Sequence, residues 1–316
     1  MTFKFFLEAN SDNAETNNSQ FASIFISVFN SKSDGLASYY NHANINNVIH
    51  DLTAHTKDPF RYIFSEEFAN NAGFLDKTGA TFIKLGFYLF LAAMKSSYIL
   101  KDNLETSVQE SITDILGKSL FYINTNFAKL VKRFPNLSAF GAMTTFGSSI
   151  VFMDVGFALL NNEKFGQQIQ EYKRFRNLVL SFINDIIAKC QNTKLNNISR
   201  FLVTVFRGLQ FTYSKIKGLV SSLRRLISSK NEQVVIQEGL TDSIVGRILK
   251  FLLRLTGVSL LIAIAFSFLD DATNGKLTRM IQNYQGPFKD FFHKLMNLYD
   301  QTKTKIHQVF AQQQTS

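Results

Sequence analysis

The stretch LSAFGAMTTFGSSIVFMDVGFALL, residues 137–160, decides the fold class of this chain. It is long and apolar and carries a single charged residue, Asp154, although its Ser, Thr and Gly residues make it only moderately hydrophobic. Strict alternation of apolar and polar positions, which would indicate a strand, does not persist in it. Pro135 follows Phe134 just before the stretch, where the sequence marks a boundary. These features predict an apolar helix.

Helical periodicity continues on both sides of this stretch. Ser107 and Glu110 have the spacing of a capping box. The segment after them carries apolar residues every three or four positions, namely Ile112, Ile115, Leu116, Leu120, Ile123 and Phe127. A chain of 316 residues can bury one large core or two modest ones without a disulfide or a metal. We therefore predict an all-α fold, a multi-helix bundle with one to three very apolar helices.

Three apolar segments are candidates for a lipid bilayer. LTGVSLLIAIAFSFL, residues 255–269, becomes 19 residues long when residues 251–254 are added, close to the ~20 that span a hydrocarbon core. Residues 137–160 form the second candidate. Residues 85–94 form the third, but a ten-residue segment between two lysines is more typical of a buried helix. Either these helices insert into a membrane or they form the core of a soluble bundle, and the sequence leaves both interpretations open.

Composition divides the chain into four parts. Residues 1–35 are predicted to be a polar, mobile lead, because residues 9–20 (ANSDNAETNNSQ) lack large apolar side chains. An N-terminal helical region follows over residues 36–134. Residues 135–235 combine the apolar helix with basic amphipathic helices, and residues 236–316 hold a C-terminal apolar helix and an amphipathic tail helix.

The excess positive charge of the chain lies in one part of the sequence. Residues 163–254 contain 16 Lys and Arg against six Asp and Glu, which equals the net charge of +10 of the whole chain. No acidic residue occurs between Asp185 and Glu232, a stretch that holds nine basic residues. This asymmetry predicts an anionic partner, either a membrane surface or a nucleic acid.

Residues 198–227, at the centre of this basic region, have the pattern of an amphipathic helix with an apolar stripe about 120° wide. The basic residues opposite or beside the stripe are Arg200, Arg207, Lys215, Lys217, Arg224 and Arg225. Such a helix suits the headgroup layer of an anionic bilayer, although nucleic-acid phosphates could use the same charges. A solvated face of a soluble bundle is the structural alternative. Because apolar segments flank the helix and no zinc-finger spacing appears in the chain, we predict an anionic membrane as the partner.

The sequence carries no motif for a reaction, a cofactor or a metal. A P-loop, a dinucleotide fingerprint and a nucleophile elbow are all absent. His42, His50 and His55 lie close together, but the last two are five residues apart and diverge by about 140° on a helix, unlike zinc-protease histidines. Cys190 is the only cysteine, which excludes a disulfide framework and fits a reducing compartment. We predict a non-enzymatic protein with no cofactor and no metal.

Asp154 is the polar residue of most functional interest, because a carboxylate inside an apolar helix must be paired, protonated or in contact with water. It is either a paired core residue or a group that faces a pore or carries protons, and both interpretations stay open. Gly141, Gly147 and Gly156 in the same stretch have the character of close-packing positions.

Two short pieces have the pattern of a proteolytic processing site. The opening MTFKFFLEAN, residues 1–10, places Glu8 before a small residue, with Phe6 two residues before it. Residues 236–240, IQEGL, place an Ile two residues before Glu238 and a Gly after it. These pieces resemble the capsid-targeting leader and the prohead-protease site of internal virion proteins of T-even-like tailed phages, although the leader has Ile or Leu in place of Phe6. The resemblance implies cleavage after Glu8 and Glu238, packaging with the genome and delivery to the next host.

Together these features predict a structural or interaction protein that engages an anionic membrane through apolar helices and a basic amphipathic helix. It would lie on the reducing side of the membrane, and the resemblance implies a virion as the setting, with other virion or membrane-complex subunits as further partners. A soluble basic scaffold that binds nucleic acid or packs inside a virion is the first alternative. An enzyme whose site assembles from scattered residues is the second.

Overall fold

The structure, a computed structural model, describes residues 19–41, 45–57, 60–105, 131, 135–160 and 164–193, together with the isolated positions Arg279, His293 and Asn297. Helices account for 88% of these residues, and no strand occurs among them. An isolated antiparallel bridge joins Tyr40 and Thr56. The described part of the chain is all-α, as the sequence predicts.

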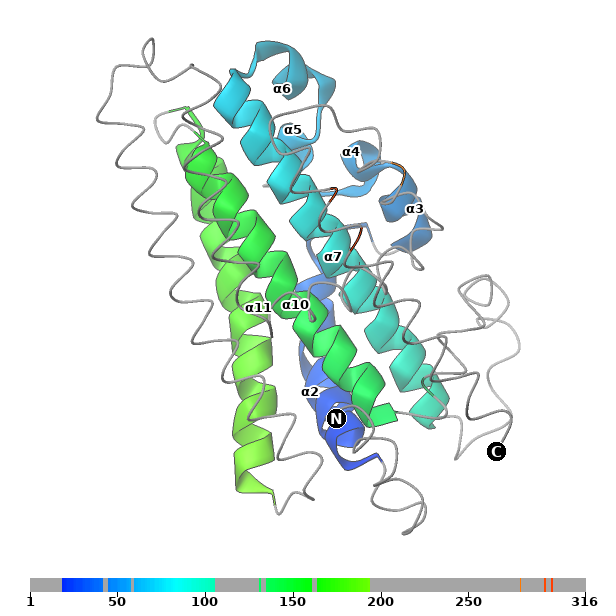
Figure 1. Cartoon of the computed structure of the whole chain (residues 1–316). Coiled ribbons are helices and arrows are strands. Elements are labelled where there is room, and N and C mark those ends of the chain that lie inside the picture. Colours follow the sequence, from blue (N-terminus) through cyan, green and yellow to red (C-terminus); the bar gives the residue numbers. More distant parts are fainter. Residues whose placement is uncertain are drawn as a thin grey trace.

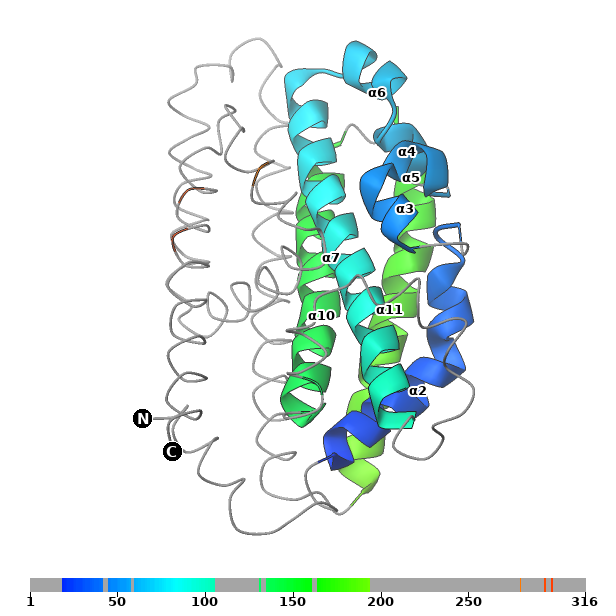
Figure 2. The same ribbon diagram turned by 90° about the vertical axis from the view of Figure 1, so that its right-hand side faces the viewer.

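Two long helices form the centre of this part. They are α7, Phe74–Glu105, with 32 residues, and α10, Pro135–Leu159, with 25 residues. They lie side by side and run in opposite directions (Figures 1 and 2). The ten-residue apolar segment between Lys84 and Lys95 is buried and is the middle of a longer helix, because α7 runs through both lysines. Lysine is a good helix former, so a charge can interrupt an apolar run without ending the helix.

Two amphipathic helices cover this central pair. They are α2, Gln20–Ala37, and α11, Gly166–Asn192, and each buries one apolar stripe in the core. α2 contacts α7, α10 and α11, while α11 contacts α2 and α10. Figure 1 shows α11 alongside α10, and Figure 2 shows α2 and α11 together on one side of the central pair.

Short helices connect α2 to α7. They are α3, Ile45–His50; α4, Leu52–His55; α5, Phe60–Ile63; and α6, Glu66–Asn71. The Asp51 carboxylate caps α4 by accepting a hydrogen bond from the backbone N–H of Ala54. The Ser65 hydroxyl caps α6 by accepting from the N–H of Phe68. Such side chains satisfy the free N–H groups of a first helical turn, which explains where these helices begin.

The core consists largely of phenylalanine. The largest fully buried side chains are Phe21, Phe25, Phe29, Phe60, Phe68, Phe87, Phe90, Phe146, Phe165, Phe175 and Phe182. The ring of Phe60 on α5 lies 4.8 Å from that of Phe87 on α7 and 5.2 Å from that of Phe175 on α11. Phe146 on α10 and Phe182 on α11 are 5.0 Å apart in an edge-to-face arrangement. Aromatic contacts of this kind join the helices into one core.

Glycines bring the backbones of α7 and α10 into contact. A Cβ atom at Gly156 would lie 2.5 Å from the carbonyl oxygen of Gly79 and 2.8 Å from the backbone nitrogen of Ile83. A Cβ atom at Gly86 would lie 2.7 Å from the carbonyl oxygen of Ser149. The contact positions are seven residues apart on each helix, so the close approach repeats every second turn. The role of Gly156 as a close-packing position, predicted from the sequence, is confirmed.

The structure differs from the predicted division of the chain near its start. Residues 20–35, expected in the polar lead, form most of α2 and bury Phe21, Phe25 and Phe29. The amphipathic pattern of α2 begins directly after the polar residues 9–20, so composition alone does not indicate where the helix starts. One hydrophobic cluster contains buried residues from α2 through α11, so the helices on either side of residue 135 share a core. The boundary near residue 236 and the predicted capping box at Ser107 lie outside the described residues.

Candidate membrane-contact helices and the Asp154 network

α7 and α10 are the helices of the described part that are long and apolar enough to cross a membrane. The apolar span of α7, Asp76–Leu104, has 29 residues, and that of α10 has 25. At about 1.5 Å per residue, both exceed the ~30 Å thickness of a hydrocarbon core. Within the molecule, 83% of the most apolar α7 window and 67% of the α10 window are buried. Length and composition therefore permit both helices to span a membrane. Core helices of a soluble protein are buried to a similar extent.

Three small polar residues of α10 satisfy their hydroxyl groups within the helix. Thr144 and Thr145 donate hydrogen bonds to the carbonyl oxygen of Gly141, at 2.8 and 2.7 Å. Ser149 donates to the carbonyl oxygen of Phe146, at 2.7 Å. Such bonds remove the need for a polar partner outside the helix. α10 therefore suits an apolar environment better than its Ser and Thr content indicates.

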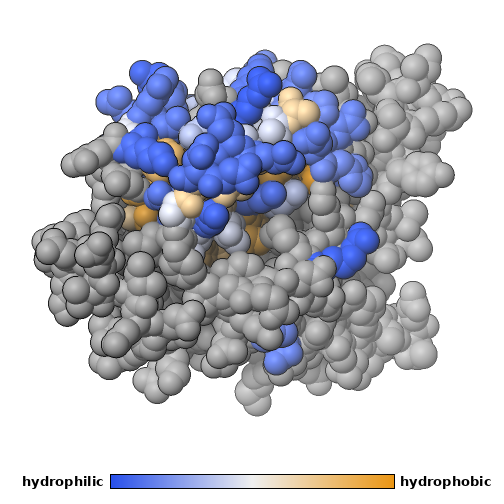
Figure 3. Space-filling view, turned by 90° about the horizontal axis from the view of Figure 1, so that it is seen from above, coloured by the Kyte–Doolittle hydropathy of each residue, from blue (hydrophilic) through white to orange (hydrophobic). Residues whose placement is uncertain are grey.

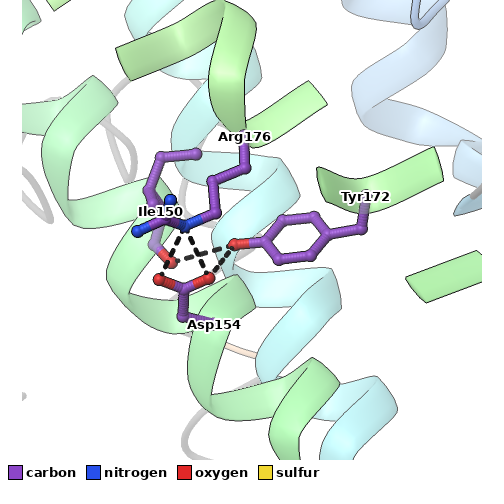
Figure 4. A network of polar contacts seen from close by, with 4 residues as sticks. All are labelled: Ile150, Asp154, Tyr172 and Arg176. Carbon is purple, nitrogen blue, oxygen red and sulfur yellow. Dashed lines mark hydrogen bonds and ion pairs between the residues drawn. The ribbon is translucent and has the colours of Figure 1, made fainter. Parts of the chain in front are cut away.

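Asp154 is paired with two residues of α11 (Figure 4). Its carboxylate accepts a hydrogen bond from the Tyr172 hydroxyl at 2.7 Å, and both of its oxygens lie 3.0 Å from Nε of Arg176. The Tyr172 hydroxyl also lies 3.3 Å from the carbonyl oxygen of Ile150, about one turn earlier on α10. Tyr172 and Arg176 are four residues apart on one helix, so both side chains reach the same carboxylate.

The Asp154 network is partly buried between the two helices. The side chains of Asp154 and Arg176 are each 16% exposed, and Tyr172 is buried. The Tyr172 ring stacks on Phe157 of α10, with 4.1 Å between the ring centroids. Burial strengthens charge-assisted hydrogen bonds, and breaking a buried ion pair by removing one partner is destabilising. In this structure Asp154 is therefore a paired residue that connects α10 to α11.

Two polar contacts that join α11 to α2 are closer to solvent. Lys32 pairs with Asp185 at 3.1 Å, with side chains 32% and 46% exposed. Lys189 donates to the hydroxyl of Ser27 at 3.0 Å in an exposed contact. Exposed pairs of this kind typically contribute below about 1 kcal/mol. The Asp154 network is therefore the more strongly buried polar attachment of α11.

Burial keeps two reactive side chains of the core protonated. The pKa of the Cys190 thiol, on the buried side of α11, is raised to about 11 by burial. The pKa of Tyr40 is raised by burial and further by the neighbouring Tyr98. A nucleophilic cysteine needs a lowered pKa, so the surroundings of Cys190 are those of a structural residue.

The end of the bundle formed by α6 and the start of α7 is polar. Seen from above, hydrophilic side chains cover most of the described surface (Figure 3). Exposed residues in and near α6 include Glu66, Glu67, Asn70, Asn71 and Lys164. A polar end of this kind is compatible with a membrane-spanning helix, because the end of such a helix meets water or lipid headgroups.

Several predicted site residues lie outside the described part of the chain. They are Arg200, Arg207, Lys215, Lys217, Arg224, Arg225, Glu8 and Glu238, together with the apolar segment 255–269. Their roles stay predictions. His50 is exposed at the end of α3, and His55 is half-buried at the end of α4. Among the described residues, no group of three or more His, Cys, Asp or Glu side chains could hold a metal ion.

The sequence did not identify Tyr172 and Arg176 as partners of Asp154. Their spacing of four places them on one side of a helix, but it does not indicate which helix they meet. Gly79 and Gly86 were also missed, although their spacing of seven matches that of Ser149 and Gly156.

Comparison with protein-family models, with curated proteins and with solved structures found no match to this chain.

Proposed function

We propose that this chain is a non-enzymatic structural or interaction protein that engages an anionic membrane, with α7 and α10 as helices that enter lipid. The observation that carries the proposal is the α7/α10 pair, in which two apolar helices of membrane-spanning length touch through glycine residues. Contacts between small residues hold helices together in lipid, where exclusion of water no longer drives association. The pair could therefore stay together when its surroundings change from protein to lipid.

The charge distribution supports an anionic surface as the partner. The region with a net charge of +10, residues 163–254, begins four residues after α10 ends. Each basic residue near an anionic leaflet contributes about 1 kcal/mol to binding. The residues proposed for this contact are Arg200, Arg207, Lys215, Lys217, Arg224 and Arg225.

Charges within the two helices restrict how the pair can lie in a bilayer. Lys84 and Lys95 are 11 residues apart on α7, which corresponds to about 16 Å along the helix axis. They would lie on either side of the midplane and extend toward opposite headgroup layers. Asp154 lies five residues before the end of α10, close to one headgroup layer. The bilayer centre can therefore remain free of these charges.

Flotation with lipid vesicles tests this function. The full-length protein should float with phosphatidylcholine vesicles that contain phosphatidylglycerol, should stay in solution with pure phosphatidylcholine, and should resist a carbonate wash. Reversal to Glu of Arg200, Arg207, Lys215 and Arg225 should abolish flotation without loss of helical content. The matched control reverses four basic residues outside the basic region, Lys57, Arg61, Lys77 and Lys101, and should float like the wild type. Equal behaviour of the two variants would contradict the proposed contact.

A soluble basic scaffold that binds nucleic acid or packs inside a virion is the second candidate. The high burial of α7 and α10 within the molecule favours it, because core helices of soluble proteins are buried in this way. We propose a phage virion as the setting for either candidate, on the resemblance of residues 1–10 and 236–240. Salt-sensitive binding to duplex DNA without vesicle flotation would support the scaffold and contradict membrane engagement.

A further inference from the structure

The contact between α11 and the central pair differs in kind from the contact between α7 and α10. The α7/α10 contact includes ring contacts such as Phe90–Phe146, but it also has a backbone approach at glycines, which does not depend on the exclusion of water. α11 instead buries one stripe of large apolar side chains, including Phe175, Val179 and Phe182. Burial of such side chains is favourable because it removes them from water. Lipid chains would also keep these side chains away from water, so lipid can replace α11 on the central pair. Lipid cannot replace the glycine contacts between α7 and α10.

The composition of α11 also suits a lipid surface. Residues 166–192 contain four basic and two acidic side chains, so the helix is positively charged overall. An amphipathic helix with a basic polar face lies in the headgroup layer of an anionic leaflet with its apolar face toward the acyl chains. α11 could therefore leave the bundle without exposing its apolar stripe to water.

We propose that α11 is a releasable cover of the α7/α10 pair, held closed by the Asp154–Arg176 ion pair and the Tyr172 hydrogen bond, and that its release at an anionic membrane admits the pair to lipid. This inference rests on the proposed function. Only six residues, 160–165, separate α10 from α11 in the sequence, so a released α11 stays near the end of α10.

The Asp154 network is the attachment that controls this cover, because it joins α11 to a helix that would enter lipid. The pairs Lys32–Asp185 and Lys189–Ser27 join α11 to α2, and they are exposed to solvent. They can therefore break without stranding a buried charge. Loss of Arg176 would remove an ion pair from a carboxylate that is 16% exposed and lies between two helices.

A thiol placed under α11 measures its release in the absence of lipid. Val179 is fully buried on α11, so Val179→Cys in a Cys190→Ala chain gives a single reporter thiol. In this chain, Arg176→Gln should raise the rate of maleimide labelling about tenfold or more, because loss of a hydrogen bond to a charged group changes an opening equilibrium by about that factor. Arg174→Gln removes the same charge from a surface pair with Glu171, so it should leave the rate within about twofold.

The same variants are then mixed with anionic vesicles, and the rate of insertion is measured by carbonate resistance. Faster labelling together with faster insertion of Arg176→Gln, but not of Arg174→Gln, is the expected result. Tyr172→Phe keeps the ring on Phe157 and loses only the hydroxyl, so it should shift both rates in the same direction by a smaller factor.

Three outcomes would overturn the proposal in distinguishable ways. Labelling rates equal for Arg176→Gln and Arg174→Gln would show that the Asp154 network does not hold α11. Faster labelling without faster insertion, in a chain that does insert, would show that release of α11 does not control entry, and the proposed function would stand. Failure of every variant, the wild type included, to bind vesicles would remove the proposed function and this inference with it.

Discussion

Substitution of Gly156 by alanine should separate α7 from α10. A single added Cβ atom would lie 2.5 Å from the carbonyl oxygen of Gly79, 2.6 Å from Cγ1 of Ile83 and 2.8 Å from its backbone nitrogen. Two of these three atoms belong to the backbone of α7, so a rotamer change cannot relieve the clash. The two helices must move apart, and the glycine contacts along the pair loosen with them.

The size of the effect follows from two opposing terms. Overpacking a well-filled core costs about 1–3 kcal/mol, and the upper part of this range applies because the obstacle is backbone. Alanine is favoured over glycine within a helix by about 1 kcal/mol, which offsets part of the cost. We expect a net loss of about 1–2 kcal/mol in the free energy of unfolding. In a chain of this size the corresponding fall in Tm is about 1.5–3 °C.

Urea unfolding followed by circular dichroism measures this change, and Gly166 supplies the control. Gly166 is the first residue of α11, and a Cβ atom there would meet nothing within 4 Å. Gly166→Ala should therefore leave stability unchanged or raise it slightly. The sign of the difference between the two variants is decisive: a Gly156→Ala chain as stable as Gly166→Ala would refute the close packing of α7 and α10.

Three further predictions concern the core and the apolar segments. Phe60→Ala should lower the free energy of unfolding by about 3–5 kcal/mol, because this fully buried ring contacts rings on α7, α10 and α11, and denaturant unfolding would measure the loss. Cys190 in the wild-type chain should react with a thiol reagent at pH 8 only after denaturation, because burial raises its pKa to about 11; immediate reaction of the native chain would contradict the burial. Ile262→Lys, within the apolar segment 255–269, should weaken carbonate-resistant membrane association, since a charge at the centre of an inserting helix costs about 3 kcal/mol; unchanged fractionation would show that this segment does not insert.

The sequence predicted the all-α class and one of the two central helices. α10 was predictable because a long apolar run without alternation follows Pro135, and the observed helix begins at that residue. The apolar segment 85–94 indicates only the middle of α7, because the apolar run ends at Lys84 and Lys95 whereas the helix continues through both. Helix length depends on backbone propensity, which lysine supports, whereas an apolar run reports only the environment of the side chains.

The partners of Asp154 could not be predicted for a physical reason. Apolar side chains occur on all sides of α10, so its pattern does not indicate which side meets which neighbour. Tyr172 and Arg176 lie 18 and 22 residues further along the chain, on a helix whose amphipathic stripe indicates only that it packs against something apolar. The pairing arises where α11 crosses α10, and periodicity along one helix contains no information about that crossing.

Depth measurement on α10 tests most directly whether this helix enters lipid. An environment-sensitive fluorophore is attached at Val151→Cys, a half-buried position of α10, in the Cys190→Ala chain. With anionic vesicles that carry spin labels at different depths, labels deep in the acyl chains should quench the fluorophore more strongly than labels at the headgroups, and its emission should shift to the blue. A protein that binds these vesicles while the fluorophore at position 151 remains unquenched at every depth would contradict the account.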